Sequence, residues 1–97
     1  MIPVVLHRAA RMEFDKAALW YEERQIDLGI EFIAEIDSCL QVIAEYPDLA
    51  PVVHGDIRRL PIKRFPYNIY YRRQDRGVIV LAIFHGKRDP AIWQRRR

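Results

Sequence analysis

One histidine stands where acid–base chemistry is possible. His85 follows the apolar run Val78 to Phe84 directly and precedes two cations, Lys87 and Arg88. Because a histidine side chain titrates near neutral pH, it can act as a general acid or base at a strand end. The alternative, which we favour, is a structural imidazole that orders the turn through a hydrogen bond to Asp89 or to the backbone.

A second group of residues combines positive charge with aromatic rings. The basic members are Arg58, Arg59, Lys63, Arg64, Arg72, Arg73, Lys87 and Arg88, and the tyrosines are Tyr67, Tyr70 and Tyr71. Such a surface can neutralise phosphates and stack on bases, which indicates nucleic-acid binding. It can equally pair with an acidic protein segment, or form a solvated strand face with tyrosines packed on arginine stems. The composition leaves these three interpretations open.

Other kinds of site are excluded by counts and spacing. Cys39 is the only cysteine, so the chain has neither an internal disulfide nor a thiolate metal cluster. The three histidines lack metal-ligand spacing, and we interpret His7 and His54 as incidental. The four glycines are isolated, so no phosphate-binding loop is present. We therefore expect no metal and no cofactor.

The elements that must position these residues begin with one strand and two helices. Val4 to Leu6 has the β-branched composition of a strand. Two helical stripes follow, one made of Ala10, Phe14, Ala17 and Tyr21, the other of Phe32, Ile36, Leu40 and Ile43. Asp27 can cap the second helix, and Pro47 ends it. A short link between the two helices predicts an antiparallel hairpin.

Three strands are expected after a turn-rich connector over residues 50–55. They are Ile57 to Phe65, Tyr67 to Arg72 and Val78 to Phe84. Pro61 indicates an edge position or a bulge in the first of them. The third is apolar at every position, which is typical of a strand covered on both faces. The helices can cover only one face, so we expect the C-terminal tail, anchored by Trp93, to cover part of the other face and a partner chain to cover the rest.

The predicted fold is therefore α+β. It is a small antiparallel β-sheet with an N-terminal strand, a helical hairpin packed on one face and then three consecutive strands, in a single domain over residues 1–97. Charge divides along this order. Residues 1–48 hold 4 basic and 10 acidic side chains (−6), and residues 49–97 hold 12 and 3 (+9), which sum to the formal +3. Such asymmetry is typical of a protein that meets a polyanion or an acidic partner.

The sequence also bears on the compartment. The longest apolar run, Val78 to Phe84, is too short to span a membrane, and the first residues lack the pattern of a secretory signal. A single cysteine suits a reducing environment. We expect a cytoplasmic protein with no membrane partner.

Several motifs in this order resemble one known family, the RelE/ParE superfamily of toxins from type II toxin–antitoxin systems. The matching stretches are Trp20-Tyr21-Glu22-Glu23, Leu28-Gly29-x-x-Phe32, Pro47, Ile57-Arg58-Arg59, Phe65-Pro66-Tyr67-x-Ile69-x-Tyr71 and Val80-Leu81-Ala82-Ile83-Phe84-His85-Gly86-Lys87-Arg88-Asp89-Pro90-x-x-Trp93. Together they cover nearly the whole chain. The Phe-Pro-Tyr strand and the ending from His85 to Trp93 are similar to the ParE branch, which is associated with plasmid stabilisation.

The resemblance implies a toxin that arrests growth by contact with DNA gyrase and that a cognate antitoxin neutralises in a hetero-oligomer. Target- or partner-binding residues would be Arg59, Tyr67, Tyr71, Arg72, Lys87, Arg88 and Trp93. An alternative is a RelE-like, metal-independent endoribonuclease acting on ribosome-bound mRNA, with charge from Lys63, Arg64 and Arg58 and a proton from His85. No tyrosine follows His85, which lowers the weight of that alternative. A further alternative is a non-toxic relative that only binds antitoxin.

Overall fold

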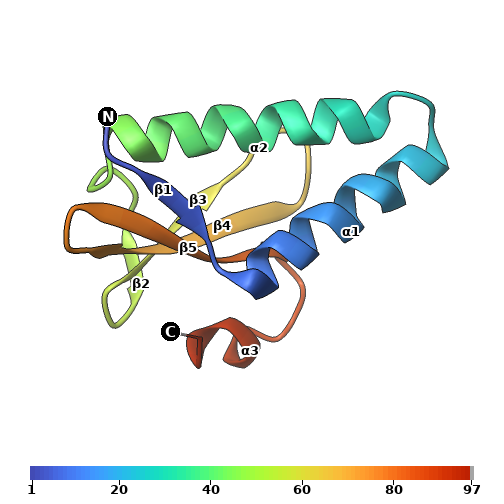
Figure 1. Cartoon of the computed structure of the whole chain (residues 1–97). Helices are drawn as coiled ribbons and strands as arrows, with labels where there is room; N and C mark the ends of the chain where they lie inside the picture. Colours follow the sequence, from blue (N-terminus) through green and yellow to red (C-terminus); the bar gives the residue numbers. More distant parts are fainter. Residues whose placement is uncertain (97) are drawn as a thin grey trace.

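A helical hairpin, a five-stranded sheet and a short C-terminal helix are stacked in that order in the computed structural model, which describes residues 1–96 (Figure 1). Along the chain the elements are β1 (Val4–Leu6), α1 (Arg8–Arg24), α2 (Leu28–Glu45), β2 (Val52–His54), β3 (Ile57–Pro61), β4 (Tyr67–Gln74), β5 (Gly77–His85) and α3 (Ala91–Gln94). The single domain predicted over residues 1–97 ends on Arg97, which lies outside the described residues.

The strand order in the sheet is β1-β5-β4-β3-β2. The strands from β2 to β5 pair antiparallel with their neighbours, whereas β1 runs parallel to β5 with Val4 opposite Val78. The predicted α+β fold is confirmed, and two details are refined. The sheet is mixed, because β1 runs parallel to its neighbour β5 and all other neighbours are antiparallel. The connector supplies an additional strand, β2, whose Val52 pairs with Arg58 on β3.

The two helices approach each other most closely near the link between them. A Cβ atom on Gly29 would lie 2.6 Å from the Ala18 carbonyl oxygen, so only glycine fits there. Asp27 is the N-cap residue of α2 with φ 70°, but its side chain makes no capping hydrogen bond. Instead, the Glu22 carboxylate accepts hydrogen bonds from the backbone N–H groups of Asp27 and Gly29, each at 3.0 Å. The predicted hairpin is thus confirmed, with Glu22 satisfying the free N–H groups at the start of α2.

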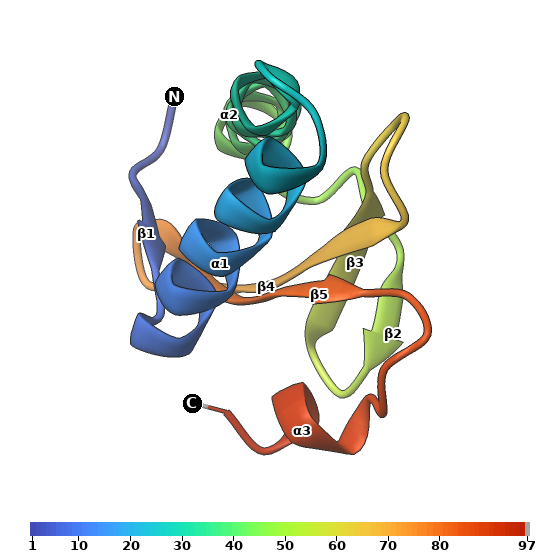
Figure 2. The ribbon, with the colours of Figure 1, turned by 90° about the vertical axis from the view of Figure 1, so that its right-hand side faces the viewer.

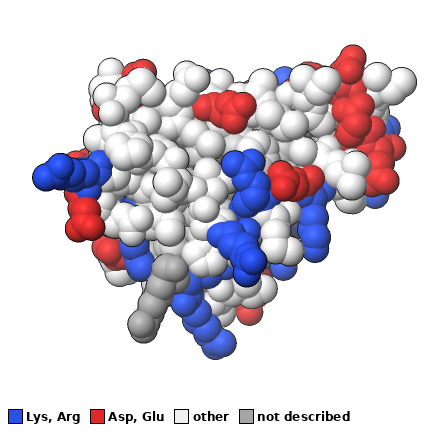
Figure 3. Space-filling view, viewed as in Figure 1, with Lys and Arg blue, Asp and Glu red and all other residues white. Residues whose placement is uncertain are grey.

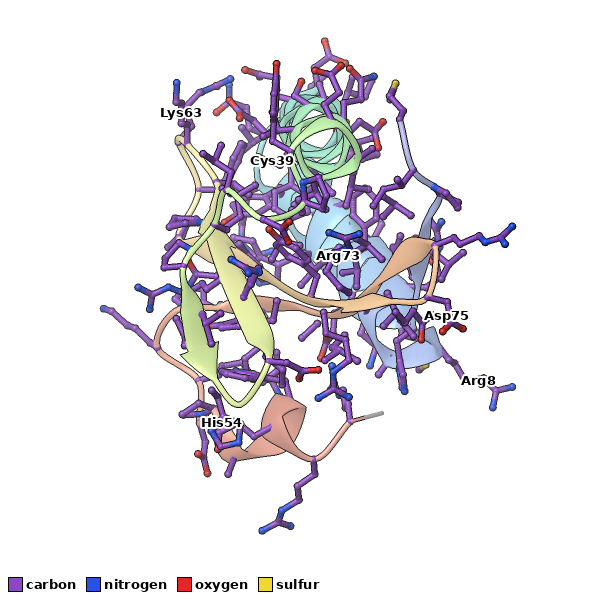
Figure 4. All side chains as sticks on the ribbon, turned by 90° about the vertical axis from the view of Figure 1, so that its left-hand side faces the viewer. Arg8, Cys39, His54, Lys63, Arg73 and Asp75 are labelled. Atoms are coloured by element: carbon purple, nitrogen blue, oxygen red, sulfur yellow. The ribbon has the colours of Figure 1, made fainter. Side chains whose placement is uncertain are left out.

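Two of the histidines have structural contacts that the sequence interpretation missed. His7 is the N-cap of α1, and its Nδ1 accepts a hydrogen bond from the Ala9 N–H at 3.0 Å. His54 on β2 packs edge-on against Trp93, with ring centroids 6.2 Å apart, and Figure 4 shows it beside α3. The interpretation of both as incidental is wrong, because a neutral imidazole nitrogen can accept like a serine oxygen and the ring can pack like an aromatic.

Strand β5 is covered on both faces, as its composition predicts. Val80, Leu81 and Ala82 have no exposed surface, and Ile83 and Phe84 are each 1% exposed. On one face Val80 and Ile83 join the core formed with α1 and α2, and on the other Leu81 and Phe84 pack with Trp93. Figure 2 shows the hairpin and α3 on opposite sides of the sheet.

The anchoring role predicted for Trp93 is confirmed. Its indole is 3% exposed and stacks on the Tyr70 ring at a centroid distance of 4.0 Å. This contact holds α3 on the sheet face away from the hairpin. Among residues 1–96 no helix has the length and the apolar character that a membrane crossing requires.

Candidate functional site

A groove of about 720 Å³ lies between α1 and the strands β4 and β5. One wall is a face of α1, on which Met12 and Trp20 are each about half exposed. The opposite wall contains Tyr67 and Ile83. The lining also includes His85, the cationic Lys16, Arg88 and Arg96, and the acidic Glu13. Large, exposed apolar side chains beside positive charge indicate a surface that binds another molecule.

A partly buried ion pair between Glu13 and Arg96 forms part of the groove lining. The Arg96 guanidinium donates to both Glu13 carboxylate oxygens, at 2.9 and 2.7 Å, and the two side chains are each 14% exposed. Glu13 also accepts the Ile83 N–H at 3.1 Å, and Arg96 donates to the Leu81 carbonyl at 3.0 Å. Pairing of β1 with β5 ends at Val80, so this ion pair satisfies backbone groups on the edge that β1 leaves open.

His85 serves the turn that follows β5. Its Nδ1 accepts a hydrogen bond from the Lys87 N–H at 3.1 Å, and its ring lies edge-on to the Tyr67 ring at 5.4 Å. This is the structural role through the backbone that the sequence analysis favoured. The neighbouring Tyr67 hydroxyl has its pKa raised by burial, an effect that the charge of Arg88 partly opposes.

The four residues that the ribonuclease alternative requires do not lie together. Arg64 forms an ion pair with Glu31 of α2 at 2.5 Å, a hydrogen bond that also raises the pKa of the Arg64 guanidinium. Figure 4 shows Lys63 beside α2, at the end of the molecule away from α3. Arg58 donates to the carbonyls of Asp48 and Ala50, at 3.0 and 2.7 Å.

The sheet register gives the scale of this separation. Arg58 stands opposite Tyr71 on β4, and His85 stands opposite Tyr67 on the same strand. Four residues of extended strand span about 13 Å. The backbones of His85 and Arg58 are therefore about 13 Å apart along the sheet, and the Arg58 guanidinium is engaged by the carbonyls of Asp48 and Ala50.

Two of the predicted binding residues are almost fully buried. Tyr71 is 1% exposed and its hydroxyl donates to the Pro47 carbonyl at 2.9 Å, so it belongs to the core, where burial raises its pKa. Trp93 presents almost no surface because it anchors α3. Arg72 pairs with Asp56 at 3.0 Å. Tyrosine occurs in strands both facing the core and facing solvent, so the sequence pattern alone could not show which tyrosines are buried.

Of the remaining predicted binding residues, Tyr67 lines the large groove, whereas Arg59 and Arg88 line a smaller cleft on the other side of the sheet. It has a volume of about 270 Å³, and Arg59, Arg88 and Trp93 contribute to its lining. Arg88 also lines the large groove, so it stands between the two hollows. Lys87 is exposed in the turn beside it.

The groove wall on α1 is the part of the site that the sequence analysis missed. Met12, Lys16 and Trp20 recur at four-residue intervals, beside the stripe that faces the core. That spacing places the three residues on one helical face. Two large apolar side chains, Met12 and Trp20, on a face expected to meet solvent were a signal of a binding surface.

The opposite charges of the two halves meet in the fold. Figure 3 shows acidic side chains gathered at one end of the molecule, with basic ones over the lower part. Ion pairs link the two halves of the chain: Arg58 and Arg73 with Asp48, Arg64 with Glu31, and Arg96 with Glu13. Much of the expected basic surface is therefore neutralised within the molecule.

No cluster of three His, Cys, Asp or Glu side chains suited to a metal ion occurs in the described part of the chain.

The chain was compared with known protein families, curated sequences and solved structures. Residues 4–90 match the family model described as "ParE toxin of type II toxin-antitoxin system, parDE". Among solved structures, a chain of the chromosomal ParDE toxin–antitoxin system from P. aeruginosa is similar, with a TM-score of 0.64 and 14% identity. That match covers 88% of this chain and 96% of the other. No curated protein sequence matched the chain. On the family match, which spans nearly its whole length, the chain belongs to the ParE toxin family of type II toxin–antitoxin systems.

Proposed function

We propose that this toxin arrests growth in the cytoplasm by binding DNA gyrase and inhibiting it through protein contact, without hydrolytic chemistry. The proposal is carried by the dispersal of Arg58, Lys63, Arg64 and His85, since cleavage of RNA needs such groups around one phosphate. Three of these residues make other contacts. Arg58 donates to the Asp48 carbonyl, Arg64 pairs with Glu31 of α2, and His85 accepts a hydrogen bond within the turn after β5.

A cognate antitoxin neutralises the toxin by laying an amphipathic segment in the groove beside α1. Support comes from two exposed apolar side chains, Met12 and Trp20, on a wall that faces Ile83. Arg24 lies over the Trp20 ring at 3.9 Å and holds it in place. A pre-ordered aromatic side chain at a groove is a typical anchor for a helical or extended partner.

The target is tested by expressing the chain under tight control. Gyrase cleavage complexes and plasmid supercoiling are then measured beside primer extension on ribosome-bound message. We expect altered supercoiling with intact message. Cut message with normal supercoiling contradicts the gyrase proposal and supports the ribonuclease alternative. Normal growth at confirmed expression supports a non-toxic, antitoxin-binding protein.

The antitoxin site is tested with two neighbouring residues of α1. Trp20 is 50% exposed and lines the groove, whereas Leu19 is 61% exposed and does not. Trp20→Ala should weaken antitoxin binding by about thirtyfold, the effect of a typical aromatic anchor. Leu19→Ala, the matched control, should change it by less than about twofold. Equal effects of the two variants would place the antitoxin elsewhere.

A further inference from the structure

The arginines in and around the sheet fall into two groups by their partners. Within residues 1–96 five of them contact a carboxylate: Arg58, Arg64, Arg72, Arg73 and Arg96. Arg59 and Arg88, like Arg76 and Arg95 of the same basic half, have no carboxylate partner among the described residues. Their guanidiniums therefore remain available to an anion from outside.

Of these, Arg59 and Arg88 line the same cleft of about 270 Å³. Arg59 reaches it from β3, where it stands opposite Tyr70, and Arg88 reaches it from the turn after β5. The Arg88 guanidinium lies over the Phe84 ring at 4.3 Å, which restricts its orientation. Two positive charges with no acid between them raise the local potential, so the cleft favours an anion over a neutral group.

A third donor in the lining lacks an acceptor. Trp93 is 3% exposed, and its Nε1–H makes no hydrogen bond within the described residues. A buried donor without an acceptor is costly, and such groups in native proteins call for an explanation. The lining of the cleft thus contains two guanidiniums and a tryptophan whose buried indole N–H has no acceptor within the described residues.

The chemistry of the lining favours a carboxylate from a protein over a nucleic acid. Tyr70 and Trp93 are stacked on each other and are 7% and 3% exposed, so neither offers an open face to a base. Val53 lines the cleft and is 40% exposed, and Ile92 on α3 is 44% exposed. Exposed aliphatic side chains beside paired guanidiniums suit an acidic residue with apolar neighbours in a polypeptide.

We propose that an Asp or Glu side chain of the antitoxin enters this cleft and is bound by Arg59 and Arg88. This inference rests on the proposed neutralisation by an antitoxin in the groove. Arg88 lines both hollows, so a segment that leaves the groove past Arg88 can reach the cleft directly. The groove then supplies apolar affinity, and the cleft supplies a charge-specific contact that fixes the register of the segment.

The test uses the purified toxin and its cognate antitoxin. Arg59→Gln and Arg88→Gln are compared with Arg76→Gln, which removes the same charge from the exposed turn between β4 and β5. Loss of a charge-assisted hydrogen bond should weaken binding by about tenfold or more for Arg59→Gln and Arg88→Gln. Arg76→Gln should change it by less than about twofold.

The outcomes separate this inference from the proposed function. If Trp20→Ala weakens binding and Arg59→Gln does not, the antitoxin lies in the groove and the cleft proposal is wrong. If the unaltered toxin does not bind the antitoxin, the proposed function fails and this inference fails with it. If Arg59→Gln weakens binding as much as expected, converting one acidic antitoxin residue to its amide should reproduce the loss without adding to it.

A second measurement locates the contact. The chain has two tryptophans, so the indole ¹⁵N–¹H signals of Trp93 and Trp20 report the cleft and the groove separately. Bound antitoxin should shift the Trp93 signal, and Arg59→Gln should abolish that shift while the Trp20 shift persists. A Trp93 signal that antitoxin leaves unmoved, or that a single-stranded oligonucleotide shifts in its place, contradicts binding of an antitoxin carboxylate.

Discussion

Replacing Arg96 with methionine should destabilise the fold, because it leaves the Glu13 carboxylate without its counter-ion. The pair is bidentate at 2.7 and 2.9 Å, and both side chains are 14% exposed. Arg96 also donates a hydrogen bond to the Leu81 carbonyl. The substitution therefore leaves this carbonyl, on the open edge of β5, without its donor. Methionine keeps most of the side-chain length and removes the charge and the donors.

The expected loss is about 2–4 kcal/mol in the free energy of unfolding. Breaking a fully buried pair costs about 3–5 kcal/mol, and the residual exposure here lowers that figure. With a urea m-value of about 2 kcal/mol/M, in the middle of the usual range for small proteins, the unfolding midpoint should fall by about 1–2 M. Adding Glu13→Gln should recover part of the loss, since the amide still accepts the Ile83 N–H.

Urea unfolding followed by circular dichroism measures this double-mutant cycle. We expect a coupling energy of about 1–3 kcal/mol between Glu13 and Arg96. Arg73→Met is the matched control, because its pair with Asp48 is 41% and 66% exposed and should contribute less than about 1 kcal/mol. A coupling energy below about 0.5 kcal/mol, or an equal loss in the control, would refute the structural role of this ion pair.

Three further predictions follow from single contacts. Tyr71→Phe removes the hydrogen bond to Pro47 and should cost about 1 kcal/mol in urea unfolding. Because the folded-state pKa of Tyr71 is raised above 10.0, its contribution is complete below that pH and is lost as pH rises through the folded pKa, so alkaline unfolding should be less steep in the variant. Gly29→Ala should cost about 1–3 kcal/mol by the same measurement, since its Cβ would overlap the Ala18 carbonyl. If the protein cleaves message, His85→Ala should slow cleavage roughly tenfold or more in a primer-extension assay, and unchanged cleavage removes His85 from that mechanism.

Much of the fold follows from patterns that the sequence shows directly. The stripe with Phe14 and the stripe with Phe32 predict two helices that share a core, and the two rings do pack edge-on at 6.0 Å. The uniformly apolar strand β5 predicts cover on both faces, and Trp93 provides part of that cover. These features could be predicted because periodicity records which face of an element is buried.

The parts that could not be predicted depend on contacts between distant residues. The pair Glu13–Arg96 joins positions 83 apart, and neither residue stands out from other charged residues in its own segment. The parallel pairing of β1 follows from where the helical hairpin returns the chain, which no local pattern records. Likewise, Arg58 and Arg59 are adjacent and chemically identical, yet Arg58 binds backbone carbonyls and Arg59 lines the cleft. Alternation along a strand separates such neighbours only once the sheet is assembled.

The proposed function is tested most directly by purified gyrase. Supercoiling of relaxed plasmid is measured with increasing toxin, alone and after mixing with one equivalent of antitoxin. We predict that inhibition increases with toxin concentration and that antitoxin relieves it. The Trp20→Ala toxin should still inhibit gyrase in the presence of antitoxin. Full supercoiling at toxin concentrations well above that of gyrase would contradict gyrase as the target.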